Sequence, residues 1–408
     1  MIPIENGSVT TPVGFSASGI VAGIKASGKP DMALIVSDRP TRCAAAFTQN
    51  AFAAPPVVYC RELLTRSHTA RAVITNSGNA NACTGRQGMH DAVDMASHTA
   101  AQLNLEADDV LVCSTGRIGV PMPMATIRAG IELAAAALTP DGGIDASRAI
   151  MTTDSIPKVL AVAVEIGEHT VHIGGMAKGA GMIAPNMKPV APHATMLAYL
   201  TTDAVLADGF LETCLAESLD QSFNRVTVDG DTSTNDTFIA LANGAAGNGA
   251  IRPGTLEAER FQAAFNHVAG HLARLMVTDG EGATKFVEIR VGGAQTRAQA
   301  KTCAFAIANS LLCKTAWFGG DPNWGRILDA AGYAGVTIQT EAVSLDYDTT
   351  PVVRNGMDAG TPEADLEAIL AKPEFRLDLE LGAGSHEYTA WTCDIGYEYV
   401  KINADYRT

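Results

Sequence analysis

The chain has 408 residues, of which 47% are apolar and 18% charged, as in soluble globular proteins with material for about two or three domains. Acidic residues exceed basic ones by 44 to 29, for a net charge of −15, and no Lys/Arg cluster indicates nucleic-acid binding. No uninterrupted apolar run is long enough to span a bilayer, and the N-terminal residues lack the basic start and apolar core of a signal peptide. The eight scattered cysteines, without a C-x-x-C pair, therefore predict reduced thiols in a cytoplasmic protein.

Apolar runs between Gly- and Pro-rich segments predict the elements of the first half of the chain. We expect strands that begin at Asp31, Cys43, Ala70 and Asp108, helices over residues 89–105 and 124–138, and a hairpin around Gly167. The strand from Ala70 runs into a loop dense in Asn, Gly and Ser, whose backbone tolerates left-handed conformations and whose amides offer donors and acceptors.

The second half is predicted to hold a strand after residue 195 and helices over residues 208–224, 256–276 and 297–312. Two strands are expected around the polar loop 229–236, and an aromatic, Gly-rich loop is expected around Trp317 and Trp324. Toward the end of the chain, FRLDLELG, EYTAWTCDIG and EYVKINADYRT predict three strands. This mixed order of elements favours sheets that are covered by helices on their outer faces.

The stretch from Lys178 to Leu197 is predicted to be an irregular loop near the middle of the chain, because its three prolines exclude a helix. It contains Ala194 and Thr195 just before a predicted strand. Cleavage between these two residues would give Thr195 a free α-amine with a pKa of roughly 7.7–8.0, which can serve as the base for its own hydroxyl group. The alternative is that Thr195 only begins a strand, where threonine is favoured.

Two glycine-containing segments supply further candidate site residues. Thr115 and Gly116 end a predicted strand, where a backbone N–H group can approach a ligand closely, so this strand end is a candidate oxyanion hole. The alternative is an ordinary turn from strand to helix. Glu281 lies between two glycines, and the alternative there is a solvated surface carboxylate.

Two other stretches match known binding motifs, but the residues around them do not support binding. Residues 179–184 fit the dinucleotide-binding pattern G-x-G-x-x-A, with Asp203 about 20 residues further on, but Pro185 excludes the helix that would hold the pyrophosphate. His267 and His271 have the i, i+4 spacing of a zinc site, but the accompanying glutamate and a third ligand are missing. We therefore predict neither a dinucleotide site nor a metal site.

Nine stretches, taken together, resemble the ornithine acetyltransferase family, the glutamate N-acetyltransferases of arginine biosynthesis. They are NSGNANACTG from Asn76, STGRIG from Ser114, TTD from Thr152, GGMAKGAGMIAPNM from Gly174, ATML from Ala194, VTVDGDTSTNDT from Val226, TDGEGATKF from Thr278, FGGDPNWGRI from Phe318 and the terminal ADYRT. Each stretch is weak alone. Together they follow one consistent order over essentially the whole chain, which makes the resemblance specific.

The family makes a precursor that cuts itself before a threonine. The resemblance therefore implies cleavage between Ala194 and Thr195 into chains of residues 1–194 and 195–408, with Thr195 as the nucleophile. It also implies that Thr115 and Gly116 form the oxyanion hole. The substrate contacts that it implies are Thr152, Lys178, Thr195, Glu281, Asn403 and Thr408.

The implied fold is a mixed α/β fold, an α-β-β-α layered sandwich similar to the N-terminal-nucleophile hydrolases, with a smaller α/β domain. The implied activity is ping-pong transfer of an acetyl group from N2-acetylornithine to glutamate through an acetyl-threonine, by two copies of each chain. No cofactor is expected, because the amide itself carries the acetyl group. Acetyl-CoA is a second donor for some family members, and the sequence leaves this donor open here. Lys178 and Glu281 are the charged groups expected to hold the substrates.

The chain departs from the family pattern at one place. Six residues, 188–193, lie between Met187 and Ala194, directly before the expected cleavage site. Self-cleavage needs a scissile carbonyl held in a defined geometry, whereas the entropic cost of a longer loop grows only slowly. Two alternatives to the transferase therefore stay open: a related self-cleaving amidase or aminopeptidase that passes the acyl group to water, and a precursor that the insertion leaves unprocessed.

Overall fold

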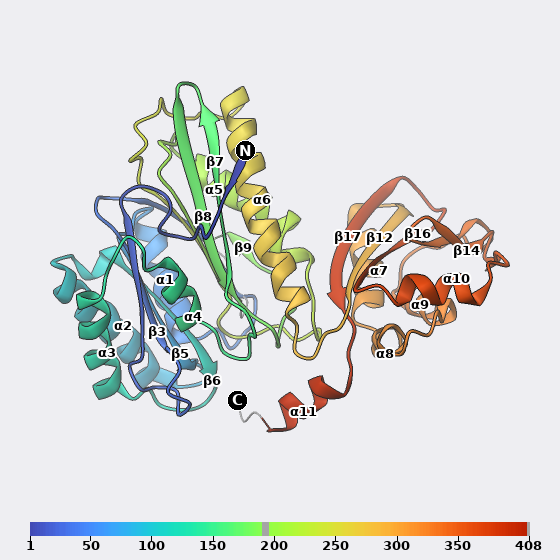
Figure 1. Cartoon of the computed structure of the whole chain (residues 1–408), viewed down its shortest axis with the longest axis horizontal. Coiled ribbons are helices and arrows are strands. Elements are labelled where there is room, and N and C mark those ends of the chain that lie inside the picture. Colours follow the sequence, from blue (N-terminus) through green and yellow to red (C-terminus); the bar gives the residue numbers. More distant parts are fainter. Residues whose placement is uncertain (190–195, 406–408) are drawn as a thin grey trace. The chain divides into compact units, whose positions relative to one another are not determined.

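The computed structural model describes residues 1–189 and 196–405, which form two compact units (Figure 1). Unit 1 comprises Met1–Asn224 and Thr232–Met276, and unit 2 comprises Arg225–Asp231 and the chain from Val277. Described elements from both sides of the predicted cleavage site therefore belong to unit 1. The division into two chains of residues 1–194 and 195–408 stays a prediction.

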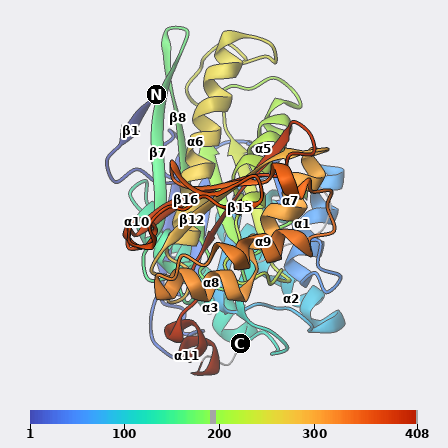
Figure 2. The same cartoon turned by 90° about the vertical axis from the view of Figure 1, so that its right-hand side faces the viewer.

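Unit 1 contains two sheets. The seven-stranded sheet has the order β1 (Ile2–Ile4), β7 (Lys158–Ile166), β8 (His169–Lys178), β10 (Leu197–Thr202), β11 (Thr237–Ala242), β4 (Arg42–Phe47) and β9 (Lys188–Pro189). The four-stranded sheet has the order β2 (Phe15–Ile20), β3 (Met32–Ser37), β5 (Ala72–Asn79) and β6 (Val110–Arg117). β7 and β8 run side by side in both views as the predicted hairpin around Gly167 (Figures 1 and 2).

The four-stranded sheet is buried on both faces. Met32 and Leu34 of β3 belong to a core shared with α2 (Gly85–Leu103) and α3 (Met124–Ala136). The alternating residues Ala33 and Ile35 belong instead to the core between the two sheets. A strand with both faces covered reads as a continuous apolar run, and this explains why DMALIVSD was recognisable in the sequence.

The outer face of the seven-stranded sheet carries α5 (Phe210–Gln221) and α6 (Leu256–Thr278) (Figures 1 and 2). The ring of Phe238 in β11 lies 6.3 Å from that of Phe265 in α6, centroid to centroid. A Cβ atom at Gly175 of β8 would lie 2.8 Å from the side chain of Leu272, so the absence of a side chain lets α6 approach the sheet.

The two sheets share an apolar core, to which α1 (Pro55–Arg66) and α4 (Gly143–Ala149) also contribute buried side chains. Helices thus cover the outer face of each sheet, and the two sheets share an apolar core. This order of layers confirms the predicted α-β-β-α sandwich.

Unit 2 is the smaller α/β part, built on a six-stranded sheet. Its order is β15 (Met357–Asp358), β14 (Thr350–Arg354), β13 (Ser344–Tyr347), β16 (Glu374–Glu380), β12 (Phe286–Ala294) and β17 (His386–Cys393). Its helices are α7 (Arg297–Ala308), α8 (Leu311–Gly319), α9 (Trp324–Gly332), α10 (Glu363–Leu370) and α11 (Tyr397–Asp405), and the described chain also has 3-10 helices at Ala107–Asp109, Phe223–Arg225 and Thr340–Ala342. The core of unit 2 includes the fully buried Leu377 and the Trp317 ring, which meets Phe375 edge to face at 6.3 Å.

The last predicted strand, EYVKINADYRT, is wrong: residues 397–405 form helix α11. The chain leaves β17 at Gly396, where a Cβ atom would lie 2.2 Å from the Phe318 ring. Helical spacing is then supported by the Lys401–Glu398 ion pair and by the Asn403 amide, which donates to the carbonyl oxygen of Tyr399. The alternating pattern of this stretch suits a strand, but its residues form the contacts of a helix.

Three other expectations need correction. The helix predicted over 297–312 is two helices, because the Ser310 hydroxyl accepts from the Cys313 N–H and begins a new helix. Trp317 lies inside α8, not in a loop. The first of the two strands predicted around the polar loop is only an isolated bridge, between Val226 and Trp391.

We predict that Leu377→Ala destabilises unit 2 by about 2–5 kcal/mol, because it leaves a cavity in a fully packed core. The chain has three tryptophans, Trp317, Trp324 and Trp391, and all belong to unit 2, so their fluorescence reports its unfolding in urea. The matched control is Leu311→Ala, at a position that is 66% exposed. Equal transition midpoints for the two variants would contradict the assigned core.

Candidate active site

The predicted oxyanion hole lies at the carboxyl ends of two parallel strands. In β5 and β6, Ser77 is opposite Thr115 and Gly78 is opposite Gly116. Gly116 has φ of +128°, and a Cβ atom on it would lie 2.5 Å from the carbonyl carbon of Gly78. Only glycine fits this backbone conformation and this close approach.

Buried polar side chains hold this strand end in place. The Ser114 hydroxyl donates to Oδ1 of Asn76 over 2.6 Å. The Asn235 amide donates to the carbonyl oxygens of Ser114 and Ala80, over 2.9 and 2.6 Å. These bonds satisfy backbone groups that end the strands, and they fix the position of the Thr115 backbone. They also give a role to three of the polar stretches on which the family resemblance rests, those that contain Asn76, Ser114 and Asn235.

Lys178 lies at the end of β8 and meets this strand end. Its side chain is buried, and Nζ lies 3.4 Å from Oγ1 of Thr115, to which it donates. β10 runs antiparallel to β8, with Leu197 directly opposite Lys178. Met196, which follows the predicted nucleophile in the chain, is fully buried and its carbonyl oxygen accepts from the Thr237 N–H over 2.6 Å. Ala194, Thr195 and Thr408 lie outside the described residues.

Thr152 and the end of β8 share one buried carboxylate. Oδ2 of Asp154 accepts from the Thr152 N–H over 3.0 Å. Oδ1 accepts from the Gly179 N–H over 2.6 Å and from Nζ of Lys158 over 2.7 Å. The side chains of Asp154 and Lys158 are both fully buried. A single carboxylate therefore connects Thr152 with the backbone directly after Lys178.

Electrostatics keep this carboxylate ionised. Burial by itself raises the pKa of Asp154, but the ammonium groups of Lys158 and Lys178 and the bond from the Gly179 N–H oppose it. The net result is a pKa well below the usual range of an aspartate.

Glu281 and Asn403 come together in unit 2. Glu281 is only 7% exposed, and its Oε2 accepts from Nδ2 of Asn403 over 2.7 Å. Gly282 has φ of +71°, and a Cβ atom on it would lie 2.8 Å from the Tyr399 nitrogen of α11. The close approach of this helix covers the carboxylate, so Glu281 is not the solvated surface residue that the sequence alone allowed.

The structure thus forms two groups of the predicted site residues. In unit 1, Thr115 and Gly116 lie beside Lys178, and Thr152 is connected to the same strand end through Asp154. In unit 2, Glu281 is paired with Asn403. The sequence analysis missed Asp154 and its ion pair with Lys158. The signal was present in the TTD stretch and its i, i+4 spacing to a lysine, but those residues do not form a helix.

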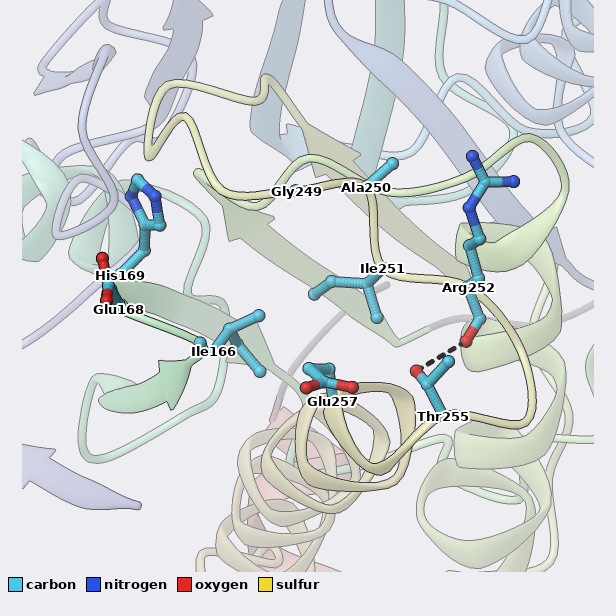
Figure 3. Close-up of a pocket in the computed structure, with 10 residues that line it drawn as sticks. Ile166, Glu168, His169, Gly249, Ala250, Ile251, Arg252, Thr255 and Glu257 are labelled. Carbon is cyan, nitrogen blue, oxygen red and sulfur yellow. Dashed lines mark hydrogen bonds between the residues drawn. The ribbon is translucent and has the colours of Figure 1, made fainter.

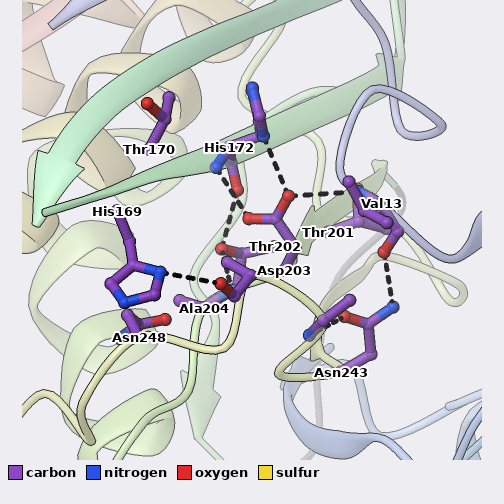
Figure 4. A network of polar contacts seen from close by, with 12 residues as sticks. Val13, His169, Thr170, His172, Thr201, Thr202, Asp203, Ala204, Asn243 and Asn248 are labelled. Atoms are coloured by element: carbon purple, nitrogen blue, oxygen red, sulfur yellow. Dashed lines mark hydrogen bonds and ion pairs between the residues drawn. The ribbon is translucent and has the colours of Figure 1, made fainter.

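The rejected motifs have structural explanations. Asp203 is fully buried and accepts from the backbone N–H groups of His172 and Val13, over 2.7 and 3.1 Å (Figure 4). It therefore joins β8 to the N-terminal segment. His267 and His271 lie on α6, where burial lowers the pKa of His271. Among residues 1–189 and 196–405, no group of three or more metal-ligating side chains is assembled.

A surface pocket of about 400 Å³ is formed by residues of unit 1 (Figure 3). It is lined by the β7–β8 turn around His169 and by the segment from Gly249 to Glu257. The charged side chains around it include Glu168, Arg252 and Glu257. Within residues 1–189 and 196–405, none of the predicted catalytic or substrate-binding residues lines this pocket. No helix in the described part of the chain is long and apolar enough to cross a membrane.

Comparison with known proteins gives the family. The family model described as "ArgJ family" matches residues 16–408. The arginine biosynthesis bifunctional protein ArgJ of Symbiobacterium thermophilum is 48% identical over 404 residues, which cover 98% of this chain and 99% of that protein. The protein of the same name from Geobacter sulfurreducens is 48% identical over 396 residues, with 97% and 99% covered.

Among solved structures, the ornithine acetyltransferase of Mycobacterium tuberculosis in complex with ornithine is 43% identical, and the match covers 46% of this chain and 98% of that chain, with a TM-score of 0.43. The full-length sequence matches are decisive by themselves. This chain therefore belongs to the ArgJ family of arginine biosynthesis proteins.

We predict that Asp154 makes the fold sensitive to acid. Because its pKa is depressed in the folded state, the ionised carboxylate stabilises the fold above the unfolded pKa of about 4, and this contribution is lost as the pH falls. The free energy of unfolding, measured in urea, should therefore fall more steeply below about pH 4 for the wild type than for Asp154→Asn. At neutral pH the variant should lose about 3–5 kcal/mol, since it removes the carboxylate from the buried Lys158 ammonium.

The control for this measurement is Asp141→Asn, because Asp141 is an exposed carboxylate in the same region of the chain. It should follow the wild type at every pH. Parallel pH dependence of the wild type and Asp154→Asn would show that Asp154 is not the stabilising anion.

Proposed function

We propose that this chain is a glutamate N-acetyltransferase, which moves an acetyl group from N2-acetylornithine to glutamate by way of an acetyl ester on Thr195. The observation that carries this proposal is the 48% identity to ArgJ bifunctional proteins over nearly the whole length of both chains. The geometry of unit 1 supports it, because Leu197 is paired with Lys178 across β8 and β10, and Lys178 donates to Thr115.

The proposed reaction begins with a cut before Thr195, which gives this residue a free α-amine. The amine takes the proton from the Thr195 hydroxyl as Oγ attacks the acetyl carbonyl carbon. Thr115 and Gly116 stabilise the oxyanion of the tetrahedral intermediate, at about 3 kcal/mol for each donor. The C–N bond then breaks, the leaving amine takes the proton, and ornithine departs from an acetyl-threonine.

The second half reverses these steps with a different amine. The α-amine of glutamate attacks the ester carbonyl, the Thr195 oxygen leaves and regains its proton, and N-acetylglutamate is released. Each bond that forms is matched by one that breaks, so the reaction needs no cofactor. A preorganised oxyanion site serves both halves, because the same carbonyl carbon is attacked each time.

The charged residues suit substrates that are amino-acid derivatives. The Lys178 ammonium of unit 1 supplies a cation for a carboxylate, and the Glu281 carboxylate of unit 2 supplies an anion for an amino group. Thr152, Asn403 and Thr408 are the remaining contacts that we assign to substrate. Because the relatives are named bifunctional, we assign acetyl-CoA as a second donor to Thr195.

Two residues of the inserted segment 188–193, Lys188 and Pro189, belong to the described part of the chain. Lys188 and Pro189 form β9, which pairs with Phe47 and Ala46 of β4 at the edge of the seven-stranded sheet. A strand anchor upstream of the scissile bond supports cleavage in spite of the longer loop, since it limits the number of conformations upstream of the bond. We propose that the two resulting chains assemble as two copies of each and act in the cytoplasm.

We predict that Thr195→Ala abolishes both self-cleavage and acetyl transfer, because it removes the attacking oxygen. Thr195→Ser should retain a part of each, since it keeps a hydroxyl group on the same carbon. Intact mass under denaturing conditions measures cleavage, and formation of N-acetylglutamate from N2-acetylornithine and glutamate measures transfer.

Thr201→Ala is the matched control, because Thr201 is a threonine of β10 whose hydroxyl donates to the carbonyl oxygen of Val9. It should cleave and transfer like the wild type. Full activity of Thr195→Ala would remove this residue from the mechanism. Release of acetate without glutamate, as fast as transfer, would indicate a hydrolase instead, and a single uncut chain without activity would indicate an unprocessed precursor.

A further inference from the structure

The peptide bond between Met151 and Thr152 lies between two charged side chains. Nζ of Lys25 donates to the carbonyl oxygen of Met151 over 2.7 Å. At the other end of the same peptide unit, Oδ2 of Asp154 accepts from the Thr152 N–H over 3.0 Å. Hydrogen bonds with an ionised partner are roughly twice as strong as neutral ones, so the orientation of this peptide plane is fixed from both ends.

Lys25 reaches this peptide from a loop that is itself rigidly built. The fully buried carboxylate of Asp31 accepts from the backbone N–H groups of Ala22, Ile24 and Lys25, over 2.6, 2.6 and 2.8 Å. Nζ of Lys25 also donates to the carbonyl oxygen of Pro30 over 2.7 Å. The ammonium group is thus held at a defined point and does not extend into solvent.

The stem of Lys25 contacts the strand end of the candidate active site. A Cβ atom at Gly78 would lie 3.1 Å from Cγ of Lys25, which means that the lysine packs directly on this glycine. Gly78 is in turn the residue opposite Gly116 in the neighbouring strand. Lys25 therefore contacts Gly78 at the end of β5 and also the segment that carries Thr152.

We propose that Lys25 is a positioning residue for acetyl transfer, which together with Asp154 fixes the Met151–Thr152 peptide and so holds Thr152 in register with Lys178. This inference rests on the function proposed above. Asp154 fixes the position of Thr152 relative to Lys178, because it also accepts from the N–H of Gly179, the residue after Lys178. Loss of the Lys25 charge weakens the bond at the Met151 carbonyl end of this peptide, and loss of the Asp154 charge weakens the bond at its Thr152 N–H end.

The charges around Lys25 make this arrangement sensitive to pH. Burial lowers the pKa of Lys25 to about 8, with Asp31 and Asp154 acting to raise it and Lys178 and Lys29 acting to lower it. Above about pH 8 the ammonium group becomes a neutral amine, which is a weaker donor to the Met151 carbonyl oxygen. Positioning of Thr152 should weaken in the same range.

The first test compares Lys25→Met with Lys25→Arg in steady-state transfer assays over a range of pH. Lys25→Met should lower kcat/KM on the order of tenfold to a hundredfold, as expected for a misplaced contact residue. The wild type should lose kcat/KM above about pH 8, whereas Lys25→Arg should keep a flatter profile, because a guanidinium group stays charged. Lys29→Arg is the control, since Lys29 is exposed on the same loop and the substitution keeps its positive charge, so the pH profile should match that of the wild type.

The second test does not depend on activity. Hydrogen exchange of the segment from Met151 to Lys158 should be faster in Lys25→Met than in the wild type, and unchanged in Lys29→Arg. Unchanged exchange in Lys25→Met would overturn the positioning role, as would an unchanged kcat/KM. A wild type that transfers no acetyl group would instead overturn the proposed function and leave exchange to decide the role of Lys25. If Lys25→Met does not fold, equal pH profiles of the wild type and Lys25→Arg overturn it.

Discussion

The buried carboxylate of Asp154 is the interaction on which the candidate active site depends. It is paired with Lys158 inside unit 1 and accepts backbone N–H groups on both sides, from Thr152 and Gly179. A buried charge is costly unless it is paired and fully hydrogen-bonded. The buried carboxylate of Asp154 therefore requires its neighbouring donors to keep this arrangement. This one side chain thereby sets the positions of the segment that carries Thr152 and of the end of β8. Local sequence preferences do not connect these two segments.

Around that anchor, the two sheets of unit 1 bring distant parts of the chain to one place. The parallel pair β5 and β6 ends in two glycines whose backbones approach too closely for any side chain. The antiparallel pair β8 and β10 places Lys178 beside the point where the described chain resumes after the predicted cleavage site. Lys178 and the predicted oxyanion residue Thr115 meet in this region, because the common core packs the two sheets against each other.

Much of the fold was predictable, because its strands and helices have strong local patterns. The run DMALIVSD and the hairpin around Gly167 were recognised by apolar continuity and by turn residues, and both are confirmed. The region of α11 was misread, since its alternation suits a strand while its contacts are helical. Asp154 and Lys25 escaped prediction for a different reason: their roles arise from hydrogen bonds to residues far along the chain or on other elements. The roles of Thr195, Thr115 and Gly116 stay predictions from the family resemblance.

The most direct test of the central claim is peptide mapping of the purified protein after incubation with N2-acetylornithine alone. Without glutamate the second half of the reaction cannot proceed, so the acetyl group should stay on the enzyme. The account predicts a mass increase of one acetyl group on the peptide that begins at Thr195, lost again when glutamate is added. An acetyl group on any other residue, or transfer that proceeds without an acetylated peptide, would contradict it.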